Sequence, residues 1–148
     1  MIRSLNTTDS ERMAKIHAQS FHKGWDDADM WAHIQKDLCF GYGRPLDGFI
    51  IISAAADQAE ILTIATDPLQ RRRGIARALL EITETELVEN GVDTLFLEVA
   101  EDNKAAITFY KGAGFEPIGR RPAYYKREIG RVAAITYRKR LAANDRLG

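Results

Sequence analysis

The stretch DPLQRRRGIARALLEI, residues 67–82, runs three arginines into a glycine where an amphipathic helix pattern begins. Apolar residues recur at helical spacing from Ile75 to Leu87 and stop at Gly91, which predicts a helix over residues 74–90. The first turn of a helix carries free N–H groups and the positive end of the dipole, so added positive charge there is unfavourable by about 0.3–1 kcal/mol per group. A bound polyanion would remove this conflict, and the stretch therefore predicts a phosphate-binding turn.

Small residues follow the three arginines. Gly74 has no Cβ, so a bulky pyrophosphate could approach its backbone, and Ala76 is the next small residue of the same turn. Arg71, Arg72 and Arg73 would add charge for further phosphate groups. The alternative interpretation is a solvated, basic first turn of a surface helix. Neither the GxxxxGK[S/T] loop nor the GxGxxG dinucleotide fingerprint is present in the sequence.

Composition narrows the class of protein. The 148 residues are 45% hydrophobic and 28% charged, which predicts one globular domain over residues 1–148. Lys plus Arg and Asp plus Glu are both 21, and this balance argues against a nucleic-acid partner, which usually needs a basic excess. The single cysteine, Cys39, predicts no internal disulfide and is expected to be a small buried hydrophobe. Without an apolar run of about 20 residues or a secretion signal, the sequence predicts a cytoplasmic protein with no membrane association.

Strands and helices alternate in the rest of the pattern. We expect a strand in residues 1–5, a helix capped by Thr7 or Thr8, a helix in 26–37, strands in 48–56, 59–66 and 94–100, a helix over 104–112 capped by Asn103, and strands near 115–119 and 132–137. This order predicts a mixed α/β fold around a central sheet, with a parallel right-handed crossover in residues 61–99. The near-continuous apolar run TLFLEVA predicts a strand buried on both faces.

Four blocks of sequence resemble one family. RRRGIA (residues 71–76) matches the pattern Q/R-x-x-G-x-G/A, and AEILTIATDP precedes it. LEVAEDNKAAITFYKGAGF and GRRPAYY follow in the order found in the GNAT superfamily of acetyl-CoA-dependent N-acetyltransferases. The last block is similar to the subgroup that acetylates the N-terminal alanine of a ribosomal protein. The resemblance covers about residues 59–125 and implies a GNAT fold, a central twisted mixed sheet with helices on both faces.

The resemblance also implies that acetyl-CoA is the co-substrate. Its pyrophosphate would meet the start of the predicted helix, its outer phosphate the arginine side chains, and its pantetheine arm the preceding strand by β-augmentation. The residues expected to bind it are Ile64, Ala65, Thr66, Arg71, Arg72, Arg73, Gly74, Ile75, Ala76, Arg77 and Asn103.

Acetyl transfer to an amine needs a proton acceptor and an acid for the departing thiolate. Glu98 interrupts the apolar run, and alternation places it on the side of Phe96 and Ala100. A carboxylate in such surroundings costs several kcal/mol unless it is solvated, paired or protonated. By resemblance Glu98 is the proton acceptor, and the structural alternative is an ion pair with an arginine of the neighbouring strand.

Two further residues are candidates for the chemistry. Glu60 stands where the histone-acetylating branch of the superfamily has its base, and the alternative is a surface charge at a strand edge. Tyr110 matches the tyrosine that would protonate the thiolate. The alternative for Tyr110 is a core anchor whose hydroxyl is hydrogen-bonded.

The acceptor is less constrained by the sequence. Trp25, Tyr124 and Tyr125 are expected to border its site, with simple packing as the alternative. The subgroup commonly has Pro-Trp at Gly24-Trp25 and an acidic pair before the last strand, which REIGRVAAITY lacks. A protein N-terminal amine is the first expectation, a small-molecule amine the second, and a non-catalytic acetyl-CoA-binding module the third, in a monomer or a homodimer.

Metal binding is not expected from the histidines. His17, His22 and His33 share no ligand spacing with a cysteine or carboxylate motif.

Overall fold

The computed structural model describes residues 1–21 and 24–141 of the chain. Within them lie the strands β1 (Ile2–Ser4), β2 (Leu38–Tyr42), β3 (Gly48–Ala55), β4 (Gln58–Thr66), β5 (Thr94–Ala100), β6 (Glu116–Lys126) and β7 (Arg131–Arg140). The α-helices are α1 (Ser10–Ser20), α2 (Asp27–Lys36), α3 (Ile75–Glu89) and α4 (Lys104–Gly112), and the short 3₁₀ helices η1 (Thr7–Asp9) and η2 (Pro68–Gln70) precede α1 and α3. The predicted helices over 74–90 and 104–112 are confirmed.

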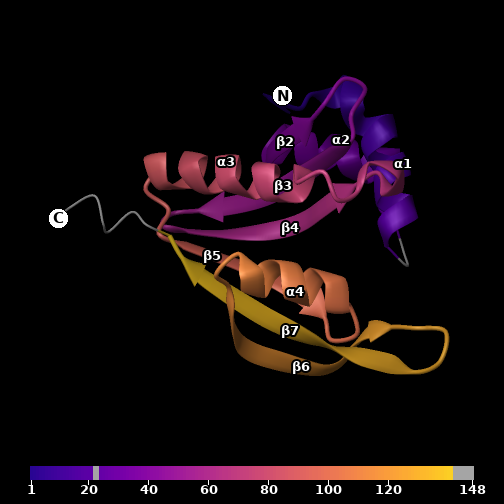
Figure 1. Cartoon of the computed structure of the whole chain (residues 1–148), viewed down its shortest axis with the longest axis vertical. Coiled ribbons are helices and arrows are strands. Elements are labelled where there is room, and N and C mark those ends of the chain that lie inside the picture. The colour runs from indigo at the N-terminus through magenta and orange to yellow at the C-terminus, as the bar shows by residue number, and fades with distance from the viewer. Residues whose placement is uncertain (22–23, 142–148) are drawn as a thin grey trace.

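The strands form one sheet in the order β1-β2-β3-β4-β5-β7-β6 (Figure 1). In the described sheet β4 and β5 run parallel, and the other neighbouring strands run antiparallel. Helix α3 connects the two parallel strands, because a parallel pair needs a crossover that returns the chain to the same end of the sheet. The expected mixed sheet with a parallel unit is therefore present.

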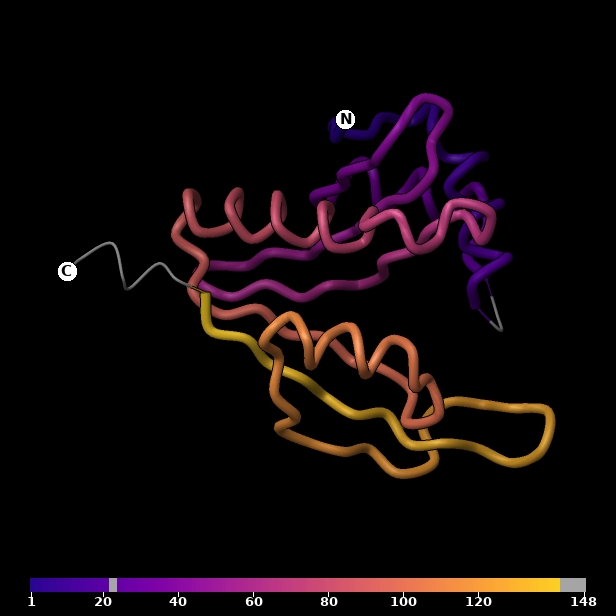
Figure 2. The backbone as a smooth tube through the Cα atoms, in the orientation of Figure 1, coloured from indigo at the N-terminus to yellow at the C-terminus, as the bar shows by residue number. Residues whose placement is uncertain are grey.

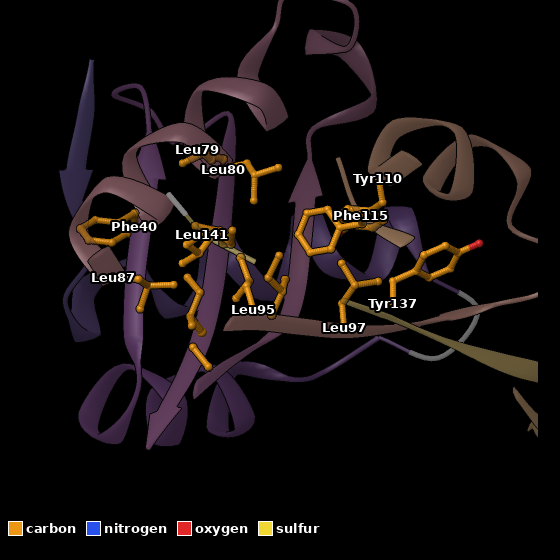
Figure 3. Close-up of a cluster of buried hydrophobic side chains, with 14 of the residues drawn as sticks. Phe40, Leu79, Leu80, Leu87, Leu95, Leu97, Tyr110, Phe115, Tyr137 and Leu141 are labelled. Carbon is orange, nitrogen blue, oxygen red and sulfur yellow. The ribbon is translucent and has the colours of Figure 1, made fainter. Parts of the chain in front are cut away.

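Helices cover both faces of this sheet. On one face α3 and α4 pack against the strands, and Figure 3 shows side chains of that cluster: Leu79, Leu80, Leu87, Tyr110, Leu95 and Leu97. On the other face α1 and α2 pack over β2, β3 and β4 through a second cluster that contains Met13, Ile16, Met30, Phe49 and Ile51. Cys39 is buried in the second cluster, as predicted. The expected GNAT-like arrangement of layers is confirmed.

Strand β4 contains an irregularity that separates it from β5. Ile52 faces Ile61 and Ile51 faces Thr63, so Leu62 is an extra residue on β4, a β-bulge. The β4–β5 register ends just before this bulge, at the pair of Glu60 with Phe96. Beyond it the two strands diverge, as Figures 1 and 2 show, and β4 continues to Thr66 without β5 beside it.

Two sequence predictions about the fold are wrong, and one strand was missed. Strand β2 was not expected, because five residues that include a glycine and follow a helix directly give little periodicity. Thr7 and Thr8 do not cap α1; instead Asn6 caps η1, accepting from the amide of Thr8. Strand β5 is not buried on both faces, since α1 and α2 cover only the β2–β4 part of their face and leave Phe96, Glu98 and Ala100 half-buried.

The last two strands are longer than the sequence indicated. They extend to residues 116–126 and 131–140 and form a hairpin. Polar and charged residues dominate the added segments, so hydrophobic patterning could not find them.

Helix α3 supplies a direct test of the packing. Leu79 is fully buried, whereas Ile82 on the same helix is 37% exposed. We expect Leu79→Ala to lower the free energy of unfolding by about 2–5 kcal/mol, because it leaves a cavity under the helix. The matched Ile82→Ala variant should lose less than about 1.5 kcal/mol. Urea unfolding of both variants measures this difference, and equal losses would contradict the packing.

Candidate active site

A hollow of about 420 Å³ opens on the sheet face opposite α3 and α4, where β4 and β5 begin to separate. Residues of five strands line it, with Ser53 and Ala55 contributed by β3. Glu60 comes from β4, Glu98 from β5, Thr136 from β7 and Arg121 from β6. The structure thus brings together both carboxylates that the sequence singled out as candidate bases.

Two residues, Arg121 and Thr136, donate hydrogen bonds to the carboxylate of Glu98 in this hollow. Arg121 donates from Nε to Oε2 at 2.9 Å and from Nη2 to Oε1 at 2.8 Å. Thr136 Oγ1 also donates to Oε2, at 3.2 Å, from the position directly across the β5–β7 ladder. The ion pair considered as the structural alternative is present, although its arginine comes from β6, two strands away from β5.

Glu60 lies exposed on β4 beside this pair. Partial burial of its carboxyl group raises the pKa of Glu60, and the negative charge of Glu98 raises it further. The positive charge of Arg121 acts in the opposite direction. Glu60 therefore holds its proton to a higher pH than an ordinary glutamate, and the two carboxylates influence each other.

Tyr110 is on the other face of the sheet. It is buried in the cluster under α3 and α4 together with Leu97, next to Glu98 in the chain (Figure 3). Its ring meets Phe109 and Phe115 edge to face, with centroids 5.2 and 5.5 Å apart. Burial raises the pKa of Tyr110, so its hydroxyl keeps its proton at neutral pH.

The arginine turn joins the end of β4 to α3. Asp67 accepts from the amide of Leu69 at 2.9 Å and from Arg12 Nη2 at 2.6 Å, which ties the turn to α1. The hydrogen bond from the Leu69 amide, followed by that from Arg12, lowers the pKa of Asp67. Arg72 and Gly74 both have positive φ, at 67° and 75°, so the chain turns sharply before the helix.

The start of α3 differs from the starts of α2 and α4. Asp26 and Asn103 cap those helices with side-chain oxygens, and the role predicted for Asn103 as a cap is confirmed. Gly74 caps α3 without a side chain, and no acidic residue stands in its first turn. A Cβ built on Gly74 would meet no atom within 4 Å apart from its chain neighbours, so the space beside this residue at the start of the helix is open. An anion could therefore reach the first turn of α3.

The remaining residues expected to bind acetyl-CoA lie at the end of β4, in the arginine turn and at the start of α3. Ile64, Ala65 and Thr66 are on the part of β4 beyond its last register pair with β5. Ile75, Ala76 and Arg77 form the first turn of α3. Arg71, Arg72 and Arg73 are exposed in the preceding turn, where Arg73 bonds Gln70.

The aromatic residues expected around the acceptor separate into two groups. Tyr124 and Tyr125 belong to β6, their ring centroids are 5.1 Å apart, and the Arg121 guanidinium lies 4.5 Å from the Tyr124 ring centroid. Burial raises the pKa of Tyr125, and the negative charge of Glu98 raises it further. Tyr125 therefore lies within the electrostatic influence of Glu98. Trp25 instead stacks between His17 and His33, at 4.8 and 4.7 Å.

Sequence reasoning missed Arg121 and Thr136. Arg121 lies in the block GRRPAYY and Thr136 in the last strand, and neither position has a local feature that marks it as part of a site. Their contacts with Glu98 require the β5–β7–β6 order, which no local pattern in the sequence reveals.

In the part of the chain that is described, no group of three or more His, Cys, Asp or Glu side chains is placed to hold a metal ion. His22 lies outside the described residues. None of the helices in the described ranges combines the length and apolar character that a bilayer crossing requires.

The fold is that of an N-acetyltransferase. The chain belongs to the acetyltransferase (GNAT) family, whose model matches residues 10–115. It is 36% identical over 138 residues to the [ribosomal protein bS18]-alanine N-acetyltransferase of Escherichia coli strain K12, covering 90% of this chain and 93% of the relative. The corresponding enzyme of Salmonella typhimurium is 42% identical over 134 residues, with 88% and 90% coverage.

A solved structure agrees with these relatives. The crystal structure of the ribosomal-protein-S18-alanine N-acetyltransferase from Escherichia coli matches with a TM-score of 0.88 at 33% identity. The match covers 95% of this chain and 93% of that structure.

The aromatic stack at Trp25 predicts a pH dependence of stability. Burial lowers the pKa of His17 to about 4, and its neutral Nδ1 accepts the Trp25 amide at 3.0 Å. The unfolded chain binds this proton below about pH 6.5 and the folded protein does not, so stability falls as the pH drops from about 6.5 toward 4. We expect His17 to account for a loss of about 2 kcal/mol between pH 7.5 and pH 5.

Urea unfolding at several pH values measures this loss. The His17→Gln variant keeps an acceptor for the Trp25 amide and has no proton to bind, so its stability should be flatter over the same range. An identical pH slope in wild type and variant would rule out this role of His17.

Proposed function

We propose that this protein transfers the acetyl group of acetyl-CoA to the N-terminal α-amine of a protein, with the alanine of ribosomal protein bS18 as the first candidate. One observation carries the proposal: where β4 and β5 separate, the candidate bases and the candidate acid lie on opposite faces of the sheet. Glu60 and Glu98 face the hollow on one side of the sheet, and protonated Tyr110 lies on the other. The names of the two enterobacterial relatives support this acceptor.

The residues around the arginine turn fit acetyl-CoA. The open space at Gly74 and the first-turn amides of α3 would receive the pyrophosphate, and the side chains of Arg71, Arg72 and Arg73 the outer phosphate. The backbone of residues 64–66, which lies beyond the register with β5, would pair with the amide groups of the pantetheine arm. Asn103 would remain the cap of α4 and contact the same arm.

The proposed proton transfers follow from the face of the sheet on which Glu98 and Tyr110 lie. The amine nitrogen attacks the thioester carbonyl, the C–S bond breaks, and the thiolate takes a proton from Tyr110 Oη. Before the attack, the ammonium form of the acceptor gives one proton to a Glu98 carboxylate oxygen, directly or through water. After the C–S bond breaks, the surplus proton on nitrogen replaces the one that Tyr110 has lost. Tyr110 can take the acid role because its hydroxyl is protonated at neutral pH and can donate to the thiolate as it forms.

Glu60 is the alternative proton acceptor. It lines the same hollow as Glu98, and its raised pKa brings it nearer to neutral pH, where a general base works best. Trp25, Tyr124 and Tyr125 would border the acceptor peptide. A single domain acting in the cytoplasm remains a prediction of the sequence.

Substitution at Gly74 tests the acetyl-CoA site. Gly74 and Gly91 flank α3 with φ of 75° and 82°, and a Cβ at either would meet nothing within 4 Å. Alanine at either position should therefore cost a similar amount of stability, about 1–2 kcal/mol, for the left-handed backbone. Only Gly74→Ala should weaken acetyl-CoA binding, by about tenfold in calorimetry, because its methyl group enters the phosphate space. Equal affinities for the two variants would contradict the placement.

Substitutions of the carboxylates separate the two bases. We expect Glu98→Gln to reduce kcat by about 10²–10⁴-fold and Tyr110→Phe by a similar factor, since each removes a proton-transfer group. Glu60→Gln should change kcat less than about threefold. Glu101→Gln, a nearby exposed carboxylate paired with Arg120, is the matched control. If Glu60→Gln abolishes turnover and Glu98→Gln does not, Glu60 is the base; in that case the acid limb of the pH profile should lie above that of an ordinary glutamate.

Turnover on defined acceptors tests the function itself. Release of free thiol from acetyl-CoA would be followed with a peptide of the bS18 N-terminus, the same peptide with a blocked α-amine, and a panel of small amines. The proposal predicts turnover of the free peptide alone. Turnover of small amines alone would replace the acceptor, and acetyl-CoA binding without any turnover would indicate a binding module.

A further inference from the structure

We infer that Arg121 is a displaceable counter-cation of the acceptor site: its guanidinium holds the position on Glu98 that the cationic amine of the acceptor must take. This inference rests on the proposed function, because it concerns how an amine reaches the hollow. Arg121 is then a gate on acceptor binding and has no part in the transfer itself.

The two partners of the ion pair differ in exposure to solvent, and this difference favours replacement of Arg121 by another cation. The side chain of Glu98 is 17% exposed, and that of Arg121 is 57% exposed. Arg121 therefore covers a carboxylate that has little other access to water. Both oxygens of Glu98 already accept hydrogen bonds, Oε1 from Arg121 and Oε2 from Arg121 and Thr136. Three of the roughly four hydrogen bonds that a carboxylate can accept are thus made, two of them by Arg121, so an amine that lies directly against Glu98 competes with the guanidinium.

Small residues keep a path for the arginine across β7. Ala100 on β5, Ala134 on β7 and Arg121 on β6 lie in one row of the sheet. Glu98 and Thr136 form the row one step away on the same face. Because neither alanine projects beyond its Cβ, the long side chain of Arg121 can cross β7 and reach Glu98. The contact between Arg121 and Glu98 thus follows from the pairing register of β5, β7 and β6.

Arg121 keeps a second partner when it releases Glu98. Its guanidinium lies 4.5 Å from the ring centroid of Tyr124, within the range of a cation–π contact. The β6–β7 register is interrupted between Arg121 and Tyr125, and Ala123 within this break has a left-handed φ of 54°. The segment that carries Tyr124 therefore stands away from the regular ladder, beside the exposed end of Arg121.

Release of Arg121 also leaves a strong attraction for an ammonium group. Glu60 and Glu98 line the same hollow, and Arg121 is the cation that contacts Glu98 there. With the guanidinium removed, the two carboxylates favour any small cation that enters. The acceptor amine has this charge before it gives up its proton.

The kinetic test compares Arg121→Ala with Arg120→Ala. Arg120 is the adjacent residue, is 56% exposed, and pairs with Glu101 outside the hollow. We expect Arg121→Ala to lower the KM for the acceptor amine about fivefold, with kcat within twofold and the KM for acetyl-CoA unchanged. Arg120→Ala should match the wild type. A fall in kcat at constant KM would show that Arg121 orients Glu98, and unchanged constants would show a purely structural pair; either result overturns the gate.

A binding test does not depend on turnover. Methylguanidinium, a free copy of the Arg121 head group, should bind the Arg121→Ala protein in an NMR titration at millimolar concentration. It should bind neither Arg120→Ala nor the double variant Arg121→Ala/Glu98→Gln. Thermal melting checks that each variant is folded, and Arg121→Lys, which keeps one charge without the two-point contact, should fall between wild type and Arg121→Ala in amine KM.

The two tests separate the gate from the enzyme activity. Methylguanidinium binding without turnover of any acceptor would support the gate and count against the proposed function. Turnover with no binding and an unchanged amine KM would retain the function and refute the gate.

Discussion

The parallel strands β4 and β5 share three register pairs and then part, and the rest of the site depends on this separation. The extra residue Leu62 lies two residues after Glu60, the last paired residue of β4, and a bulge there bends and twists the strand. If β4 and β5 stayed paired here, the backbone groups of residues 64–66 would form hydrogen bonds with β5. No gap between the two strands would then connect the two faces of the sheet. The separation leaves them beyond the register with β5, next to the turn that begins α3.

The sheet also keeps the chemical groups apart. Alternation along β5 sends Glu98 to the open face and Leu97 to the packed face, where Tyr110 is buried. Burial then favours the protonated form of Tyr110, while arginine and threonine donors hold Glu98. One strand thus separates the proposed acid from the proposed base, on opposite faces of the sheet. In the inferred gate, Arg121 relates this arrangement to the acceptor, because it pairs with Glu98 and lines the same hollow.

Local patterns in the sequence were sufficient for much of the fold. The helical period located α3 and α4, and the arginine–glycine turn indicated the open helix start that Gly74 provides. The bulge at Leu62 was not predictable, because apolar residues run through ILTI on both faces and hide the change of register. The contact of Arg121 with Glu98 depends on the β5–β7–β6 strand order, and the raised pKa of Glu60 depends on the same assembly. Such long-range relations exist only after the sheet has formed.

Amide hydrogen exchange with and without acetyl-CoA tests the central claim, that the separated part of β4 and the start of α3 together form the acetyl-CoA site. The account predicts slower exchange on binding at the backbone amides of residues 62–66 and 74–77, with no change at residues 58–60, which are already paired with β5. Protection confined to other segments, or none while binding is saturated, would contradict it.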